Sequence, residues 1–280
     1  MNAVQYPQRS PVDSPTGAWR LFASVGISAR SHWEETRHAA AVIGTAIYTG
    51  MQPRYWKRAI RTAFSRQLMA IGVEPLLFVG ALAVFVGVSV VVQLSSWIGA
   101  AGQSQLLGPV LVTVVARELG PVLMNLVVIV RSGSAMTTEL GVMKIDGGVR
   151  RFETQGNDVF RELVVPRVLA MAVSTFCLTI VFIFVAFASG YFFAASTGHG
   201  SRDLLLFIDT VSRAVQPRDV LNILAKSVLP ALFASACCCI GGLGAAESVT
   251  DIPPATQRAL TRSVAGLFVI SAVVSLLTYL

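Results

Sequence analysis

One long uncharged stretch decides the fold: residues 75–116 read PLLFVGALAVFVGVSVVVQLSSWIGAAGQSQLLGPVLVTVVA, without Asp, Glu, Lys or Arg. A transmembrane helix needs about 20 apolar residues, so this stretch holds most of two spans. The Gly-, Ser- and Gln-rich segment 95–105 divides them and is expected to be a loop. The stretch predicts an integral membrane protein.

The composition agrees with a lipid environment. Hydrophobic residues make up 54% of the chain and charged residues only 13%, whereas soluble domains carry about 25% charged residues. The net charge of +7 is expected to set topology and to meet anionic lipid headgroups, so we expect no nucleic-acid partner. The cysteines lie in apolar segments without a nearby histidine, so we expect packing residues and no metal site: Cys177, Cys237, Cys238 and Cys239.

The remaining apolar segments complete the fold class. We predict an all-α integral membrane protein, with an N-terminal interfacial helix followed by five transmembrane helices. The spans are expected at about 75–94, 106–130, 168–196, 223–244 and 264–280.

The N-terminal part is predicted to stay on one side of the membrane. Residues 1–35 are polar and carry no signal-peptide pattern, so we expect a disordered cytoplasmic segment. Residues 39–68 are expected to form the interfacial helix, with Trp56, Ile60 and Phe64 on its apolar face. A helix that packs on protein instead remains an alternative for this segment.

Lys and Arg are unevenly distributed among the connections. Nine precede the first span, none lies in the loop after it, and six lie in residues 131–167. Because cytoplasmic loops are enriched in these residues, the N-terminus and the second loop are expected in the cytoplasm. Five spans then place the C-terminus in the periplasm.

Three ionisable residues lie within the predicted spans. Arg117 and Glu118 fall near the middle of the second span, where each charge costs at least about 2.5–3.5 kcal/mol. Either they line a polar transport site or they form structural ion pairs between helices. Lys226 lies just inside the fourth span, where it is either a further intramembrane charge or a snorkelling side chain.

Small residues recur at every fourth position of the third span, at Ala186, Gly190, Ala194 and Gly198. Such a stripe lets two helices approach closely. Packing within the chain and dimerisation explain it equally well.

A longer motif carries a family resemblance. Residues 116–145 read ARELGPVLMNLVVIVRSGSAMTTELGVMKI. The run resembles the signature of the MlaE/YrbE-type permeases: R-E-L-G-P, then R-x-G-[SA]-A, then E-[LI]-G-x-M-[KR]. Weaker matches follow in order at VPR (165–167), LNILAKSV (221–228) and ATQRALTRSV (255–264). The resemblance covers residues 36–280 as one permease domain.

The resemblance implies an assembly and a task. Members form a homodimer in the bacterial inner membrane, with two cytoplasmic ABC ATPase subunits below and a ring of periplasmic MCE-domain proteins above. Phospholipid or a related lipid moves between that ring and the membrane. ATP and Mg²⁺ would bind the ATPase, and no cofactor is expected on this chain, which has no G-x-x-x-x-G-K-[ST] motif.

The resemblance also implies site residues. The lipid-binding set is Arg117, Glu118, Leu94, Trp97 and Ile98. A coupling helix at about 135–152 would contact the ATPase through Glu139, Leu140, Gly141, Met143 and Lys144. Where the family reads T-E-Q, this chain has Asp146, Gly147 and Gly148, which predicts an early end of that helix or a divergent ATPase.

Two other functions remain open. One is a permease for another hydrophobic cargo, such as a sterol or a toxin. The other is an intramembrane lipid-modifying enzyme built on Arg117 and Glu118, which would lack a recognisable nucleophile and base. We therefore expect no catalytic residue and a transport subunit.

Overall fold

A computed structural model describes residues 37–50, 52, 58–100, 110, 112–156, 158–197, 209, 212–213, 216–244 and 248–279. Every regular element within those ranges is a helix. Five helical segments in them are long and apolar enough to cross a membrane: Ile60–Leu94, Val112–Ile145, Phe160–Ser196, Pro217–Leu243 and Val249–Thr278. The all-α class and the five spans are confirmed.

The first two spans each contain π-helical turns. The first comprises α2 (Arg58–Leu68), the π-turn η2 (Met69–Val73) and α3 (Leu76–Ala100). Pro75 interrupts it, since proline has no backbone N–H to continue the helical ladder. The second comprises η4 (Val112–Leu119), α5 (Gly120–Val128), η5 (Ile129–Gly133) and α6 (Ser134–Ile145).

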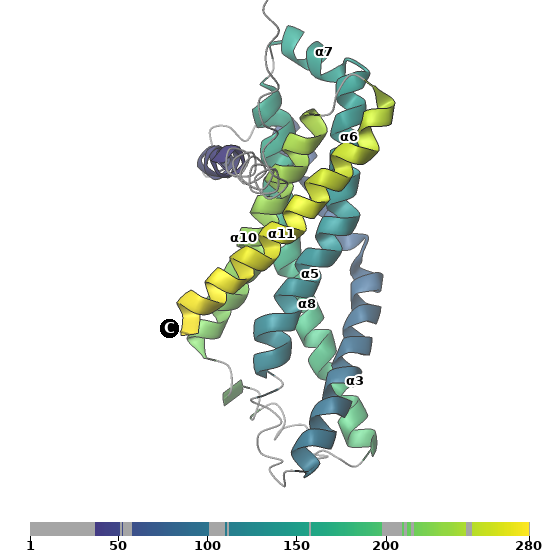
Figure 1. Ribbon diagram of the computed structural model, residues 1–280, viewed down its shortest axis with the longest axis vertical. Coiled ribbons are helices and arrows are strands. Elements are labelled where there is room, and N and C mark those ends of the chain that lie inside the picture. The colour runs from purple at the N-terminus through teal and green to yellow at the C-terminus, as the bar shows by residue number, and fades with distance from the viewer. Residues whose placement is uncertain are drawn as a thin grey trace, which may run out of the picture.

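The other spans are more regular. The third comprises the π-turn η6 (Phe160–Val164) and α8 (Val165–Thr197), and the fourth is α10 (Pro217–Leu243). The last comprises the 3₁₀ turn η7 (Val249–Asp251) and α11 (Ile252–Tyr279). In Figure 1, α3 and α8 run together toward one end of the bundle, and α11 crosses it obliquely beside α10.

The helices extend beyond several predicted boundaries. Helix α3 continues to Ala100, into the segment expected to be a loop. The second span runs past Arg131 to Ile145, and the third begins at Phe160. Charged residues were expected to end these helices, but Arg131 and Arg167 find carboxylate partners on neighbouring elements, so helix can continue through them.

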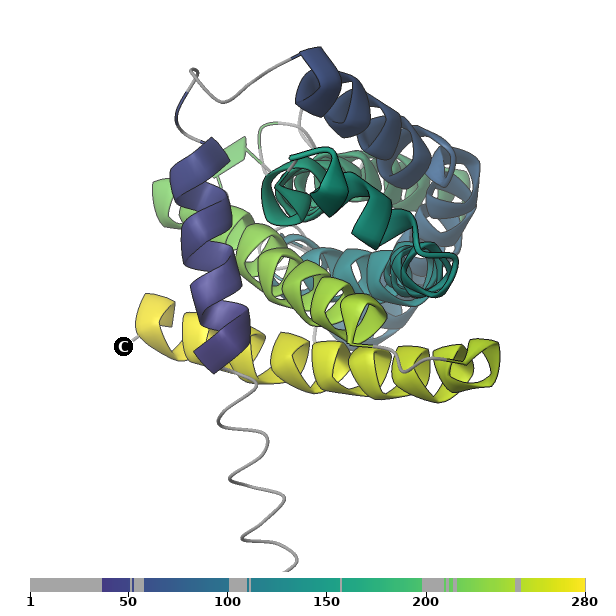
Figure 2. The same cartoon turned by 90° about the horizontal axis from the view of Figure 1, so that it is seen from above.

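The predicted interfacial helix is two helices. One covers residues 37–50, and the next begins at Arg58. Figure 1 shows the first nearly end-on and Figure 2 shows it lengthwise, so it lies across the long axis of the bundle. Ile60 on α2 is 8% exposed and Phe64 packs on the core, so this face meets protein. Trp56 lies outside the described residues.

Small residues let α3 and α8 approach closely. A Cβ atom at Gly87 would overlap the carbonyl oxygen of Ala186 and lie 2.6 Å from Ser189 Oγ. A Cβ atom at Gly190 would lie 2.6 Å from Val91 Cγ2. The small-residue stripe therefore serves packing within the chain at Ala186 and Gly190.

The predicted coupling helix at 135–152 is also two helices. Helix α6 ends at the cap residue Asp146, Gly147 has φ of 71°, and α7 (Gly148–Thr154) follows. Glycine adopts this left-handed conformation at little cost. The early end of the helix is confirmed, and α7 lies across the end of the bundle at which α11 begins, opposite the end where α3 and α8 run together (Figure 1).

Candidate functional site

Two prolines, Pro121 and Pro230, each leave a backbone carbonyl inside the bundle without its helical N–H partner. Pro121 has no N–H to offer the carbonyl of Arg117 four residues earlier, as an α-helical ladder would require. The ammonium of Lys226, on α10, instead donates to Arg117 O at 3.3 Å. In lipid, a backbone group freed by proline must find such a partner inside the protein.

The same relation recurs on α10. Pro230 has no N–H to offer the carbonyl of Lys226, again four residues earlier. Asn125 on α5 donates from Nδ2 to Lys226 O at 3.1 Å and to Pro121 O at 2.8 Å. Asn125 is 1% exposed, so this amide joins α5 to α10 inside the bundle.

Glu118 completes the first of two ion pairs. Lys226 Nζ lies 2.6 Å from Glu118 Oε1, and Ser275 on α11 donates to the same oxygen at 3.3 Å. The Lys226 side chain has no exposed surface, whereas that of Glu118 is 46% exposed. The pair therefore connects η4, α10 and α11, with its carboxylate at the surface of the chain.

Arg117 forms the second ion pair. Its Nη2 donates to Asp219 Oδ2 at 2.9 Å, and its Nε lies 2.8 Å from Asp219 Oδ1. The Asp219 side chain is 3% exposed, that of Arg117 17%. Asp219 also accepts from the backbone N–H of Gln216 at 2.8 Å, which caps the start of α10. Two cations and two carboxylates thus balance at the contact of η4 with α10.

These contacts decide between the expectations for Lys226. They favour a buried intramembrane charge over a snorkelling side chain, because the Lys226 side chain has no exposed surface and its ammonium pairs with Glu118. A buried ammonium needs a partner to offset the loss of hydration, and Glu118 supplies it.

The other predicted lipid-binding residues lie on α3. Leu94 is 8% exposed and belongs to the hydrophobic core. Trp97 and Ile98 lie within α3, but their side chains fall outside the described part of the structure. Their expected contact with lipid stays a prediction, as does that of Arg117 and Glu118.

The predicted coupling residues divide by exposure. Leu140 and Gly141 are buried in this chain, where a Cβ atom on Gly141 would lie 3.4 Å from Ile252. Glu139 is 57% exposed and accepts from Arg167 Nη2 at 2.8 Å. Lys144 is exposed, as Glu139 is, whereas Met143 is partly buried and packs against the core of the chain.

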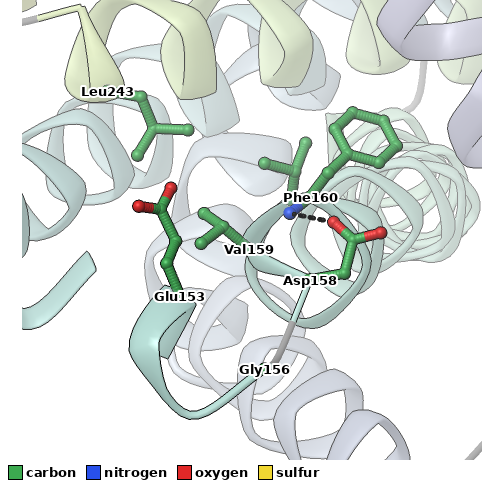
Figure 3. A pocket seen from close by; sticks show the side chains of 7 residues that line it. Glu153, Gly156, Asp158, Val159, Phe160 and Leu243 are labelled. Atoms are coloured by element: carbon green, nitrogen blue, oxygen red, sulfur yellow. Dashed lines mark hydrogen bonds between the residues drawn. The ribbon is translucent and has the colours of Figure 1, made fainter. Parts of the chain in front are cut away.

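A cavity of about 620 Å³ lies beside α7 at the same end of the bundle (Figure 3). Its lining combines two carboxylates with apolar side chains: Glu153, Gly156, Asp158, Val159, Phe160, Val164 and Leu243. Asp158 accepts from the backbone N–H of Phe160 at 3.0 Å and pairs with Arg161 at 3.2 Å. Two carboxylates beside apolar side chains suit a basic side chain with an aliphatic stem.

Sequence reasoning missed Asp219, Asn125 and Ser275. Asp219 was assigned to the third loop, because Pro217 was not taken as a helix start. A proline within a span leaves the carbonyl four residues earlier without its N–H partner. Pro121 and Pro230 could therefore have indicated that side chains such as Lys226 and Asn125 donate to those carbonyls.

Comparisons with known proteins agree with this architecture. The sequence model of the family described as Permease MlaE matches residues 64–277. Protein TRIGALACTOSYLDIACYLGLYCEROL 1, chloroplastic, of Arabidopsis thaliana is 28% identical over 191 residues, which are 68% of this chain and 54% of that protein. The chain thus spans about half the length of that relative.

Two bacterial relatives extend the comparison. A probable ABC transporter permease protein of Synechocystis is 28% identical over 203 residues, 72% of this chain and 76% of the relative. The intermembrane phospholipid transport system permease protein MlaE of Haemophilus influenzae is 30% identical over 125 residues, 45% of this chain and 48% of the relative. Because the family model covers most of the five-span bundle, the chain belongs to the MlaE permease family.

Proposed function

We propose that this chain is the permease subunit of an ABC transporter that moves phospholipid or a related lipid. The lipid would pass between the bacterial inner membrane and a periplasmic MCE-domain partner. A separate ATPase chain would bind ATP and Mg²⁺ and supply the energy. The name of the Haemophilus influenzae relative, which specifies intermembrane phospholipid transport, supports the choice of cargo.

The proposal rests on two ion pairs, Arg117 with Asp219 and Lys226 with Glu118, in a chain of this family. Charges inside a membrane span are costly and typically mark a substrate pathway. Arg117 keeps 17% of its side chain exposed, and Glu118 keeps 46%. A lipid phosphate would approach the exposed edge of Arg117 and compete with Asp219 for its guanidinium.

The end of the bundle that carries α7 is proposed to meet the ATPase. Exposed Arg150 and Arg151, together with outward-facing Glu139 and Lys144, offer charged contacts there. The cavity beside α7 would receive a basic side chain of the partner between Glu153 and Asp158. This assignment places α7 in the cytoplasm and the C-terminal end of α11 in the periplasm, and a homodimer would bind two ATPase chains.

The decisive experiment separates a lipid ligand from a helix brace. Arg117→Ala alone leaves the buried carboxylate of Asp219 without its cation, so it is expected to lower thermal stability. The double variant Arg117→Ala/Asp219→Asn removes both charges and should restore assembly. Crosslinking of this double variant to a photoreactive phospholipid then reports the ligand role without the folding defect.

The proposal predicts that the double variant assembles but loses about tenfold in crosslinking, the equivalent of about 1.4 kcal/mol. Asp219→Asn alone is the matched control, because it keeps Arg117 and should crosslink at least as well as the parent. Parental crosslinking by the assembled double variant would contradict a ligand role for Arg117.

A further inference from the structure

A second amphipathic site lies where the first span bends. Glu74 and Pro75 form the turn between η2 and α3, and Arg131 lies in η5 on the second span. Arg131 Nη2 lies 3.2 Å from Glu74 Oε2, and the two side chains are 44% and 64% exposed. The exposed ion pair thus joins the residue that caps η2 to the π-helical turn η5, and such turns recur at functional sites.

An apolar groove opens on one side of this pair. It has a volume of about 630 Å³ and, beside Glu74 and Arg131, is lined by Pro75, Leu77, Phe78, Leu126, Val127 and Val130. Leu77 is 89% exposed, Phe78 58% and Val130 56%. Apolar side chains so open to the outside of a membrane span suit acyl chains.

A polar cleft opens on the other side of the same pair. It has a volume of about 290 Å³, and its polar lining includes Arg66, Gln67 and Ser132 beside Glu74 and Arg131. Glu139 also lines it, but its carboxylate is already engaged by Arg167 at 2.8 Å. Arg66 adds a cation to this cleft, and a ligand phosphate and ammonium would have to replace the exposed 3.2 Å contact between Arg131 and Glu74.

The position along the span fits a headgroup. At about 1.5 Å per residue, Arg131 lies about 21 Å from Arg117 along the helix, which separates this site from the central ion pairs. The second span continues beyond Arg131 to Ile145. At the same rise, its 34 residues extend over about 51 Å. This length exceeds the hydrocarbon core of about 30 Å, so one end of the span lies in the headgroup region.

We propose that this cleft and groove bind a phospholipid whose headgroup carries a phosphate and a primary ammonium. The phosphate lies between Arg66 and Arg131, the ammonium meets Glu74, and the acyl chains occupy the groove along Phe78 and Val130. The occupant is a membrane lipid, because an apolar groove that shares Glu74 and Arg131 with a charged cleft matches an amphiphile and not a free phosphate ion. The site is distinct from the central ion pairs and does not depend on transport.

The test places a photocrosslinker in the groove of the full chain. With Phe78→p-benzoylphenylalanine, the chain is reconstituted in vesicles that contain phosphatidylethanolamine or phosphatidylglycerol, each radiolabelled in the phosphate. The expected result is stronger labelling by phosphatidylethanolamine. Arg66→Ala and Arg131→Ala should each lower that labelling about five- to tenfold. Glu74→Gln should remove the preference between the two lipids.

Two controls keep the result specific. Arg61→Ala removes an exposed cation of the same helix α2 that lines neither space, and should leave labelling unchanged. The Arg117→Ala/Asp219→Asn variant should also label normally, so this site and the transport proposal can fail separately. If Arg131→Ala does not fold, the labelling of Arg66→Ala alone tests whether the cleft binds the lipid phosphate.

Three results would overturn the proposal. Equal labelling in all variants would indicate lipid that merely surrounds the protein. Equal labelling by both lipids would contradict the assignment of the ammonium to Glu74. Crosslinking of the groove to a second copy of the chain, in place of lipid, would identify the groove as a contact between protomers.

Discussion

Lys226 makes two contacts with its side chain and a third with its backbone carbonyl. It pairs with Glu118, it serves the carbonyl of Arg117, and its own carbonyl is served by Asn125. Lys226→Met keeps the aliphatic stem and removes the ammonium, so Glu118 loses its cation. We expect a loss of about 1–3 kcal/mol in stability, limited because Glu118 is partly exposed.

A double-mutant cycle with Glu118→Gln checks this expectation by thermal unfolding of the chain in detergent. Lys226→Met/Glu118→Gln should recover part of the loss, because no unpaired charge remains. Purely additive losses in the double variant would mean that the two side chains do not interact.

Asn125 is predicted to stabilise the bundle because Pro230 is present. Asn125→Leu leaves the carbonyls of Lys226 and Pro121 without their side-chain donor, which should cost about 0.5–2 kcal/mol. Pro230→Ala restores a backbone N–H for Lys226 O. Melting temperatures should therefore show Asn125→Leu to be less damaging in a Pro230→Ala background, and equal damage in both backgrounds would refute the link.

At the scale of elements, the contact of α3 with α8 depends on Gly87. Any side chain there would meet the backbone of Ala186, which cannot move away as a flexible side chain could. Gly87→Leu is therefore expected to cost at least about 3 kcal/mol, or to abolish the folded chain. The yield of monodisperse protein from membranes measures the effect.

Gly80 supplies the control on the same helix. A Cβ atom at Gly80 meets nothing within 4 Å, so Gly80→Leu makes the same chemical change without an overlap. It should give near-parental yield. Equal losses at both positions would show that leucine harms α3 for reasons other than its contact with α8.

The junction between α6 and α7 depends on Gly147. Gly147→Ala places a side chain at φ of 71°, which costs about 1–2 kcal/mol in the junction although nothing lies within 4 Å. We expect nearly normal folding but a changed angle of α7, and therefore weaker stimulation of the partner ATPase. Gly44→Ala, with open space and no left-handed φ, is the control. Unchanged stimulation with Gly147→Ala would separate α7 from coupling.

The elements show where sequence reasoning succeeds and where it stops. The five spans can be predicted from hydrophobicity, and the end of α6 from Asp146, Gly147 and Gly148. Both features are determined by residues that are close together in the sequence. The pairing of Arg117 with Asp219 joins residues 102 positions apart. The local sequence pattern does not indicate a contact between residues so far apart. The partner of Arg117 therefore could not be predicted from the sequence.

At the scale of the whole molecule, the five spans form a bundle with α7 at one end (Figure 1). The two ion pairs of Arg117 and Lys226 join η4 to α10. Glu118 and Arg117 retain exposed surface, and Leu77 and Phe78 leave an apolar groove open on another side. We propose that the chain contacts lipid at both places and that a partner chain supplies the energy for moving lipid.

The most direct test reconstitutes the chain with its proposed ABC ATPase partner. Vesicles carrying the complex are given ATP and Mg²⁺, and transfer of a fluorescent phospholipid to an acceptor is measured. The account predicts no ATP hydrolysis by the chain alone, ATP-dependent lipid transfer by the complex, and at least about tenfold less transfer with assembled Lys226→Met. ATP hydrolysis by the isolated chain, or a complex that hydrolyses ATP and moves no phospholipid, would contradict it.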